Sequence, residues 1–318
     1  MTTTANQLIT MIDQQASRSA PPAVHGLAGE ILQRYGQAVQ AILFYGSCFR
    51  SGDAYEGLVD LYVLVDDYRS AYDSYLPAFL NKLLPPNVFY LEIEFEGRVI
   101  RSKYTVFSML DFQQGTSMHW FHSYLWGRFA QPVGLMYVRN EQAAEMVKAA
   151  LGQAVLTFLT RAIPAVSAQF EASELWGAGL LLSYRSELRS ERPQKLGLLF
   201  DTARPYFEQL TAAAIELLPY PAAVVAGSDP PRYGASIPRR TRFFNRLAWR
   251  VRSWQGKVLS VLRLLKALLT FQGGVDYILW KIERHSGVTV EASARLRRIP
   301  IVGLLVVFWR LYRRGAFR

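Results

Sequence analysis

A glycine and a serine that could bind phosphate follow a short apolar run in the N-terminal part of the chain. Residues 41–45 predict a buried strand, and Gly46 and Ser47 come directly after it. Backbone N–H groups at such a turn, together with the Ser47 hydroxyl, can hold a triphosphate. After 12 intervening residues comes Asp60, early in a second apolar run, where its carboxylate can bind Mg²⁺ over the same phosphates. The spacing therefore predicts a site for a polyphosphate and a divalent cation.

Further carboxylates are needed for two-metal chemistry. The usual place for a second acid, two residues after the first on the same strand face, is occupied by Tyr62. The other candidates are Glu92, Glu94, Glu187 and Glu191. A purely structural interpretation stands beside the chemical one: Gly46 then forms a tight turn, Ser47 caps a helix and Asp60 ends a loop.

Three later segments carry cations and carboxylates in a regular order. Residues 101–108 read Arg-Ser-Lys-Tyr-Thr-Val-Phe-Ser, and residues 127–133 read Gly-Arg-Phe-Ala-Gln-Pro-Val. The third segment begins with Leu-Ser-Tyr at 182–184, and its charged residues are Glu187, Arg189, Glu191 and Lys195. Each segment also has a structural interpretation, as solvated hairpin charges, a structural ion pair or a charged helix face.

The elements that must position these groups follow from the hydrophobic pattern. It predicts strands at 58–65, 87–95, 98–106 and 132–138, with a hairpin turn at 96–97. It predicts helices at 23–35, 68–84, 141–159 and 167–182, and a linker at 219–238. The expected fold class is α+β, with a mixed domain at 1–138, a helical domain at 139–230 and a basic region at 231–318.

Taken together and in this order, the motifs resemble the mitochondrial translocator assembly and maintenance family, which are phosphatidate cytidylyltransferases. The resemblance runs from about residue 42 to residue 271. The chain departs from the family's pattern at Cys48, Thr105, Ser186 and Glu187. The resemblance implies a polymerase-β-type nucleotidyltransferase domain, a winged-helix-like second domain and a C-terminal helix that meets the membrane, here a basic amphipathic helical tail.

The reaction that the resemblance implies converts CTP and phosphatidic acid to CDP-diacylglycerol and pyrophosphate, with Mg²⁺. In this scheme Asp60 binds the metal ion and Lys103 neutralises charge on the triphosphate. The catalytic candidates are Asp60, Lys103, Glu187 and Arg189. The nucleotide-binding candidates are Gly46, Ser47, Tyr104, Arg128 and Lys195.

Residues 231–318 form a strongly cationic region. They contain 19 of the chain's 36 lysines and arginines but three of its 25 acidic residues. Apolar positions 258, 261, 262, 265 and 269 fall on one helical stripe, and basic amphipathic helices of this kind bind anionic membrane surfaces. The predicted membrane-binding residues are Arg263, Lys266, Trp309, Arg310, Arg313 and Arg314.

Two other interpretations of the basic region remain open. Its apolar stripe could pack on the rest of the protein with the arginines solvated, or its cations could bind nucleic acid. The density of leucine, valine and tryptophan favours lipid, so the expected partners are CTP, phosphatidic acid and an anionic membrane surface, with no nucleic acid.

The remaining features bear on location and on other functions. One cysteine in 318 residues predicts neither an internal disulfide nor a thiolate zinc cluster. The apolar run at 299–309 is shorter than the roughly 20 residues that span a bilayer, and no presequence is visible. We therefore expect a peripheral protein at the cytoplasmic face of a bacterial inner membrane.

Two further functions stand as alternatives. One is a nucleotidyltransferase with a protein, RNA or small-molecule acceptor, and the other is a catalytically degenerate protein that binds membranes or nucleic acid. His119 and His122 have a ligand-like spacing, but the aromatic residues around them favour packing over metal binding.

Overall fold

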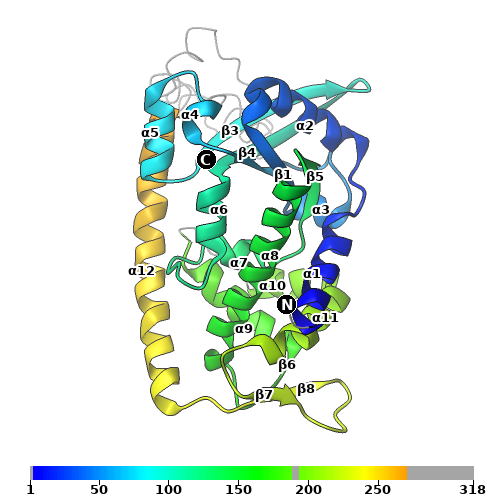
Figure 1. Ribbon diagram of the computed structural model, residues 1–318, viewed down its shortest axis with the longest axis vertical. Helices are drawn as coiled ribbons and strands as arrows, with labels where there is room; N and C mark the ends of the chain where they lie inside the picture. Colours follow the sequence, from blue (N-terminus) through cyan, green and yellow to red (C-terminus); the bar gives the residue numbers. More distant parts are fainter. Residues whose placement is uncertain (1–2, 188–192, 271–318) are drawn as a thin grey trace, which may run out of the picture.

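The computed structural model describes residues 3–187 and 193–270 of the chain. A five-stranded sheet lies at one end of the molecule, a group of helices lies at the other, and a long helix runs along one side (Figure 1). The strands are β1 (Val39–Tyr45), β2 (Val59–Val65), β3 (Asn87–Phe95), β4 (Arg98–Ser108) and β5 (Gly134–Val138). The sheet order is β3-β4-β2-β1-β5, with β2 and β4 parallel and the other neighbours antiparallel. The fold is therefore mixed α+β, as predicted.

The central strands β1 and β2 are covered on both faces. Their sequences are almost wholly apolar, which suits strands with no solvent-facing side. Helix α2 (Pro22–Tyr35) packs on one face, and α6 (Met109–Thr116) and α8 (Glu141–Ala162) cover the other. The predicted hairpin is confirmed, because β3 and β4 pair along their length around Glu96 and Gly97, which both have positive φ.

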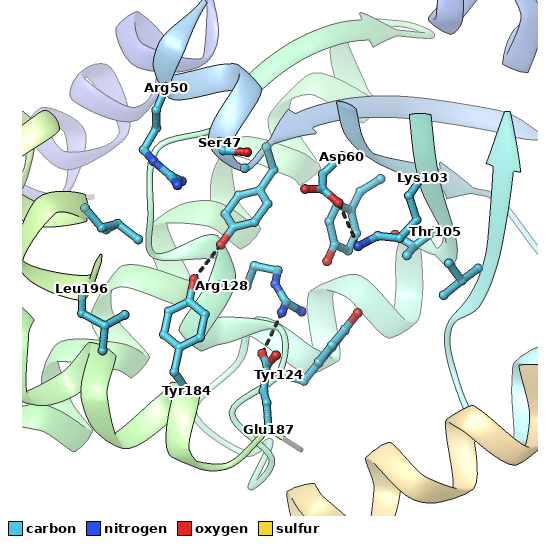
Figure 2. Close-up of a pocket in the computed structure, with 15 residues that line it drawn as sticks. Ser47, Arg50, Asp60, Lys103, Thr105, Tyr124, Arg128, Tyr184, Glu187 and Leu196 are labelled. Atoms are coloured by element: carbon cyan, nitrogen blue, oxygen red, sulfur yellow. Dashed lines mark hydrogen bonds and ion pairs between the residues drawn. The ribbon is translucent and has the colours of Figure 1, made fainter. Parts of the chain in front are cut away.

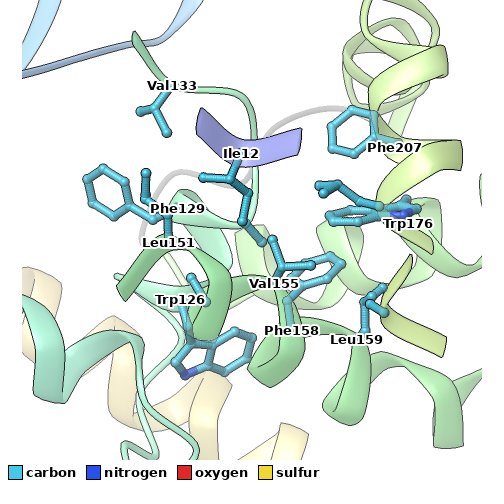
Figure 3. Close-up of a cluster of buried hydrophobic side chains, with 14 of the residues drawn as sticks. Ile12, Trp126, Phe129, Val133, Leu151, Val155, Phe158, Leu159, Trp176 and Phe207 are labelled. Carbon is cyan, nitrogen blue, oxygen red and sulfur yellow. The ribbon is translucent and has the colours of Figure 1, made fainter. Parts of the chain in front are cut away.

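The helical part is built around α8. Its other main helices are α1 (Thr3–Ala16), α7 (Trp126–Phe129), α9 (Ala172–Arg185), α10 (Pro193–Thr202) and α11 (Arg204–Ala214). In its core, the Trp176 ring stacks on Phe158 at 4.7 Å and lies 4.5 Å from Phe207 (Figure 3). The indole N–H of Trp176 donates to Thr211 Oγ1 at 2.9 Å, so its buried polar atom is satisfied. The same cluster includes Leu43 of β1, so one core continues from the sheet into the helices.

Several elements differ from those predicted. The first residues of the predicted helix at 167–182 instead form β6 (Gln169–Glu171), with the helix starting at Ala172, and the predicted linker contains β7 (Ala222–Val224) and β8 (Arg232–Ala235). These three strands form a second sheet of order β6-β8-β7. Strands of three or four residues are too short for an alternating pattern to show in the sequence.

The short helices complete the description. The predicted helix at 68–84 is split into α4 (Tyr68–Ala71) and α5 (Tyr75–Leu83) by extended residues between them. The remaining short elements are α3 (Ser47–Ser51) and the single turns Gly36–Ala38, Ile163–Ala165 and Ile215–Leu217.

Helix α12 (Arg239–Thr270) is 32 residues long, and three of its cations, Arg252, Arg263 and Lys266, donate hydrogen bonds to backbone carbonyls of the protein. Arg252 is buried, and its Nε donates to the carbonyl of Phe121 at 2.8 Å. Gly256 fits closely against the end of α9, since a Cβ there would lie 2.1 Å from the carbonyl oxygen of Ser186. The inward face therefore docks through hydrogen bonds and close backbone contact.

The outward face of α12 is apolar and exposed. Spacings of three and four residues along the helix place these side chains on one stripe. They are Phe243, Phe244, Leu247, Val251, Trp254, Val258, Val261, Leu262, Leu265 and Leu269, each at least 38% exposed. A surface helix usually turns its apolar side chains inward, whereas this stripe does not pack on residues 3–187 or 193–238 of the protein.

One helix of the described part is long and apolar enough to cross a membrane by length and composition. It runs over residues 141–165, from the start of α8 through the turn that follows it. Because 67% of its most apolar window is buried inside the protein, α8 has the environment of a core helix.

Candidate functional site

A cavity of about 450 Å³ lies between strands β1, β2 and β4 of the five-stranded sheet and the helices α7, α9 and α10. Figure 2 shows that side chains from both parts of the molecule point into it. Its charged lining residues are Arg50, Asp60, Lys103, Arg128 and Glu187. Gly46 and Ser47 also line it, so six of the nine residues predicted as catalytic, metal-binding or nucleotide-binding sites border one space.

The turn after β1 brings Gly46 against the carboxylate of Asp60. Antiparallel pairing of β1 and β2 places Tyr45 opposite Asp60. Gly46 has φ +95°, and a Cβ at this position would lie 2.7 Å from Asp60 Oδ2. Any larger residue would both strain the backbone and displace the carboxylate. Glycine is therefore required for the turn and Asp60 to meet, and Ser47 begins α3 at the same point.

Asp60 forms an ion pair with Lys103 across the parallel strands β2 and β4. The register pairs the two residues directly, and Lys103 Nζ lies 2.9 Å from Asp60 Oδ1. The negative charge of Asp60 raises the pKa of Lys103, so the ammonium stays charged at neutral pH. Both side chains remain partly exposed, at 39% for Lys103 and 26% for Asp60, and can reach a ligand.

Arg128 and Glu187 form a second ion pair that joins α7 to the end of α9. Arg128 Nη2 donates to Glu187 Oε1 at 2.7 Å, and the guanidinium lies 4.4 Å from the centre of the Tyr124 ring. Burial is the largest single influence and opposes the charge of Arg128, but the Glu187 carboxylate together with the neighbouring tyrosines raises the pKa of the guanidinium. Arg128 Nη1 is buried and has no hydrogen-bond partner among the described residues, so it is free to donate to a ligand.

Arg50 is the cation of this cavity that has no acidic partner within residues 3–187 and 193–270. It lies in the last turn of α3, three residues after Ser47, and its side chain points toward the space between the sheet and the helices (Figure 2). The sequence prediction missed this residue. The available signal was its place one helical turn after the proposed phosphate turn. With Arg50 included, three cations face two carboxylates, which favours an anionic ligand.

Neutral hydroxyl groups form one wall of the cavity. The Tyr45 and Tyr184 hydroxyls are 3.1 Å apart, and Tyr45 donates to Gln131 Oε1 at 3.3 Å. Burial raises the pKa of Tyr45 and of Tyr62 far above the ordinary value, so both stay protonated. These tyrosines add hydrogen-bonding groups without adding charge.

Tyr104 does not border the cavity. Successive residues of a strand face opposite sides, so Lys103 and Tyr104 of β4 cannot both point into the same space. Tyr104 is fully buried on the α2 side, where its hydroxyl accepts from Arg34 Nη1 at 2.7 Å and its ring stacks on Phe89. The prediction that Tyr104 binds the nucleotide alongside Lys103 is therefore wrong.

Arg263 and Lys266 lie on the inward face of α12. Arg263 Nε donates to the carbonyl of Pro85 at 2.8 Å, and Lys266 Nζ donates to the carbonyls of Leu84 and Pro86 at 2.6 and 2.7 Å. These carbonyls follow the C-terminus of α5, where unpaired acceptors attract cations. The prediction that both residues contact a membrane is wrong, because they are engaged by the protein.

Several other candidates lie elsewhere. Glu92 pairs with Arg101 on the hairpin, and neither it nor Glu94 borders the cavity. Lys195 belongs to α10, whose Leu196 and Leu199 line the cavity, but its side chain is outside the described part. Arg189, Glu191, Trp309, Arg310, Arg313 and Arg314 lie outside the described residues.

The cavity offers a magnesium ion two carboxylates, and each has one oxygen in an ion pair, Asp60 with Lys103 and Glu187 with Arg128. Within the described ranges there is no group of three or more His, Cys, Asp or Glu residues that could hold a metal ion. Mg²⁺ is commonly held by one or two carboxylates together with substrate phosphates and water, so Asp60 fits as its single protein ligand. Glu187 is held by Arg128, and His122 is buried and stacks on Tyr124, as packing predicts.

No protein-family model matches the chain, and a search of curated proteins finds no significant match. The resemblance to phosphatidate cytidylyltransferases therefore rests on the motifs, and the geometry of the cavity carries the argument for function.

Proposed function

We propose that the protein is a phosphatidate cytidylyltransferase that binds CTP in this cavity and acts at a membrane surface. The observation that carries the proposal is the meeting, in one cavity, of the Gly46–Ser47 turn, the Asp60 carboxylate and three cations. Nucleotidyl transfer needs these components, because most of the catalysis comes from positioning and from neutralising phosphate charge.

The cations have separable tasks in this proposal. Lys103 and Arg50 stand on either side of the Gly46–Ser47 turn and neutralise the β- and γ-phosphates. Arg128 has a free Nη1 and offers a directed hydrogen bond to a phosphate oxygen. Asp60 would hold Mg²⁺, which supplies charge neutralisation on the triphosphate when bound.

The transfer step needs no strong base. A phosphate oxygen of phosphatidic acid forms the new bond to the α-phosphorus of CTP, and the bond from that phosphorus to the β-bridging oxygen breaks. The products are CDP-diacylglycerol and pyrophosphate, and the electron pair leaves with the pyrophosphate. Because the attacking phosphate is already anionic, the neutral tyrosine wall is compatible with the reaction.

The architecture supports the same proposal. The antiparallel β1–β2 pair with the turn after β1 and Asp60 on β2 suits a polymerase-β-type nucleotidyltransferase domain. Helices α9–α11 with the small β6-β8-β7 sheet suit the winged-helix-like second domain. The apolar stripe of α12 carries no acidic residue beside it and suits peripheral attachment to an anionic membrane, as at a bacterial inner membrane.

The direct test is incubation of the full chain with α-labelled CTP, Mg²⁺ and vesicles that contain phosphatidic acid. We expect label in CDP-diacylglycerol. Label transferred instead to added RNA or protein would show that the protein is a nucleotidyltransferase whose acceptor is not phosphatidic acid. No transfer together with no CTP binding would leave a protein without this activity and overturn the proposal.

A further inference from the structure

A second helix with an exposed apolar face lies next to α12. Helix α5 exposes Tyr75 by 76%, Leu76 by 58%, Phe79 by 61% and Leu83 by 68%. Their spacing along the helix puts them on one side, which we call the α5 patch. Four large apolar side chains exposed together form a contiguous patch of the kind that marks an interaction site.

The polar side of α5 faces inward, as it does in α12. Asn81 is fully buried, donates to the carbonyl of Val106 at 3.0 Å and accepts from the N–H of Asn87. Both helices thus satisfy polar groups inside the protein and present apolar groups outside. The apolar outer faces of both helices are unfavourable in water, so covering them with an apolar partner would lower the free energy.

Hydrogen bonds fix the two helices beside each other. Arg263 and Lys266 of α12 bind the carbonyls of the three residues that follow α5. In Figure 1, α5 lies against the C-terminal end of α12 at the same edge of the molecule. Val88, two residues beyond Pro86, lines the cavity. The segment that the two helices hold between them therefore leads directly into a strand that lines the candidate site.

We infer that the α5 patch and the stripe of α12 form one surface that binds an anionic lipid bilayer. The charge of the surface selects this occupant: α12 contains no acidic residue and α5 carries one charge, that of Lys82. Exposed basic residues of α12 beside the stripe are Arg239, Arg246, Arg250 and Lys257. The inference rests on the membrane partner of the proposed function and adds α5 as a second insertion point.

The test compares binding of the full chain and its variants to vesicles of phosphatidylcholine with and without phosphatidic acid. Phe79→Glu combined with Leu83→Glu should weaken sedimentation with anionic vesicles by about tenfold or more, because two apolar side chains that enter the bilayer are replaced by carboxylates. Leu198→Glu in α10 is the matched control, since Leu198 is 65% exposed away from both helices. It should bind vesicles like the unmodified protein.

Three outcomes contradict the inference. Unchanged vesicle binding of the double variant would exclude α5 from the surface. A large loss of thermal stability without lipid would show that the chain itself covers the α5 patch. A change from dimer to monomer on light scattering would identify a second copy as the occupant.

Calorimetric titration with CTP separates this inference from the proposed function. The double variant should bind CTP as the unmodified protein does, because the α5 patch lies outside the cavity lining. Failure of the unmodified protein to bind CTP would remove the proposed function, while the vesicle result would still decide the role of α5.

Discussion

The cavity and the outer face of α12 place their charges in opposite ways. In the cavity, carboxylates and cations pair with one another and face an open space. On α12, Arg252, Arg263 and Lys266 face the protein, and the apolar side chains face outward. The difference shows that helical periodicity identifies which residues share a face, whereas the partners offered by the rest of the protein decide where that face points.

Those partners are backbone carbonyls. The segment after α5 contains two consecutive prolines, which have no N–H to donate, and it leaves acceptors exposed at a helix end. Long cationic side chains can satisfy them, and leucines cannot. The cost of leaving carbonyls unpaired thus explains why α12 turns Arg263 and Lys266 toward the protein and its apolar stripe outward.

Asp60→Asn is expected to give the largest effect on the cavity side of the comparison. The amide keeps the shape of the side chain but removes the charge that pairs with Lys103 and would hold Mg²⁺. We expect kcat/KM for CDP-diacylglycerol formation to fall by about 1,000-fold or more. Glu92→Gln, an acid of the hairpin outside the cavity, is the control and should keep its activity. An active Asp60→Asn protein would refute the role of Asp60.

Arg128→Met tests the ion pair between Arg128 and Glu187 in the cavity. Because Glu187 would lose its partner, the free energy of unfolding should fall by about 3 kcal/mol in chemical denaturation. Arg128→Met with Glu187→Met should regain much of that loss. CTP binding should stay lost in both variants, since the free Nη1 is gone. Recovery of CTP binding in the double variant would show that Arg128 is only structural.

Arg50→Gln separates binding from stability. Arg50 has no acidic partner in the described part, so its loss should change the free energy of unfolding by less than about 0.5 kcal/mol. The affinity for CTP should fall by about 30-fold, with a smaller effect on CMP, which lacks the β- and γ-phosphates. Arg98→Gln at the hairpin tip is the matched control. Equal losses for CTP and CMP would contradict a role at the distal phosphates.

The smallest expected effect is on stability and comes from His122, a buried residue between the cavity and α12. Burial, with Arg263, Arg128 and Arg252 nearby, lowers the pKa of His122 from 6.5 to about 3. The unfolded chain therefore takes up a proton below pH 6.5 that the folded protein refuses, and stability falls as the pH drops toward 3. Between these two pKa values, His122 should contribute about 1.4 kcal/mol per pH unit to the pH dependence of the free energy of unfolding. His122→Phe should flatten it in denaturant titrations at several pH values, and an unchanged slope would contradict the buried neutral imidazole.

The sequence predicted the parts of the site that depend on single strands. The Gly46–Ser47 turn follows one apolar run and Asp60 lies early in the next, both visible in the pattern, and the hairpin strand β4 brings Lys103 beside Asp60. The prediction for Tyr104 was wrong because Lys103 and Tyr104 are adjacent in a strand, where successive side chains point to opposite faces of the sheet. Arg50 was missed because it lines a cavity and has no acidic partner in the described part of the chain that a charge pattern could have indicated.

The surfaces could be predicted less well. The stripe of α12 was recognisable as a stripe, but its outward direction depends on carbonyls that lie about 180 residues earlier in the chain. The strands β7 and β8 were interpreted as a linker because they are only three and four residues long. The central strand β8 pairs with β7 and with β6, and β6 is distant in the sequence. Such long-range partners are set by the fold and leave no local pattern.

Calorimetric titration of the full chain with CTP in the presence of Mg²⁺ tests the central claim, that the cavity binds a nucleoside triphosphate. We expect saturable binding that Arg50→Gln weakens by about 30-fold and that Arg98→Gln leaves unchanged. Absence of binding, or equal affinity in the Arg50→Gln protein, would show that this cavity is not a nucleotide site.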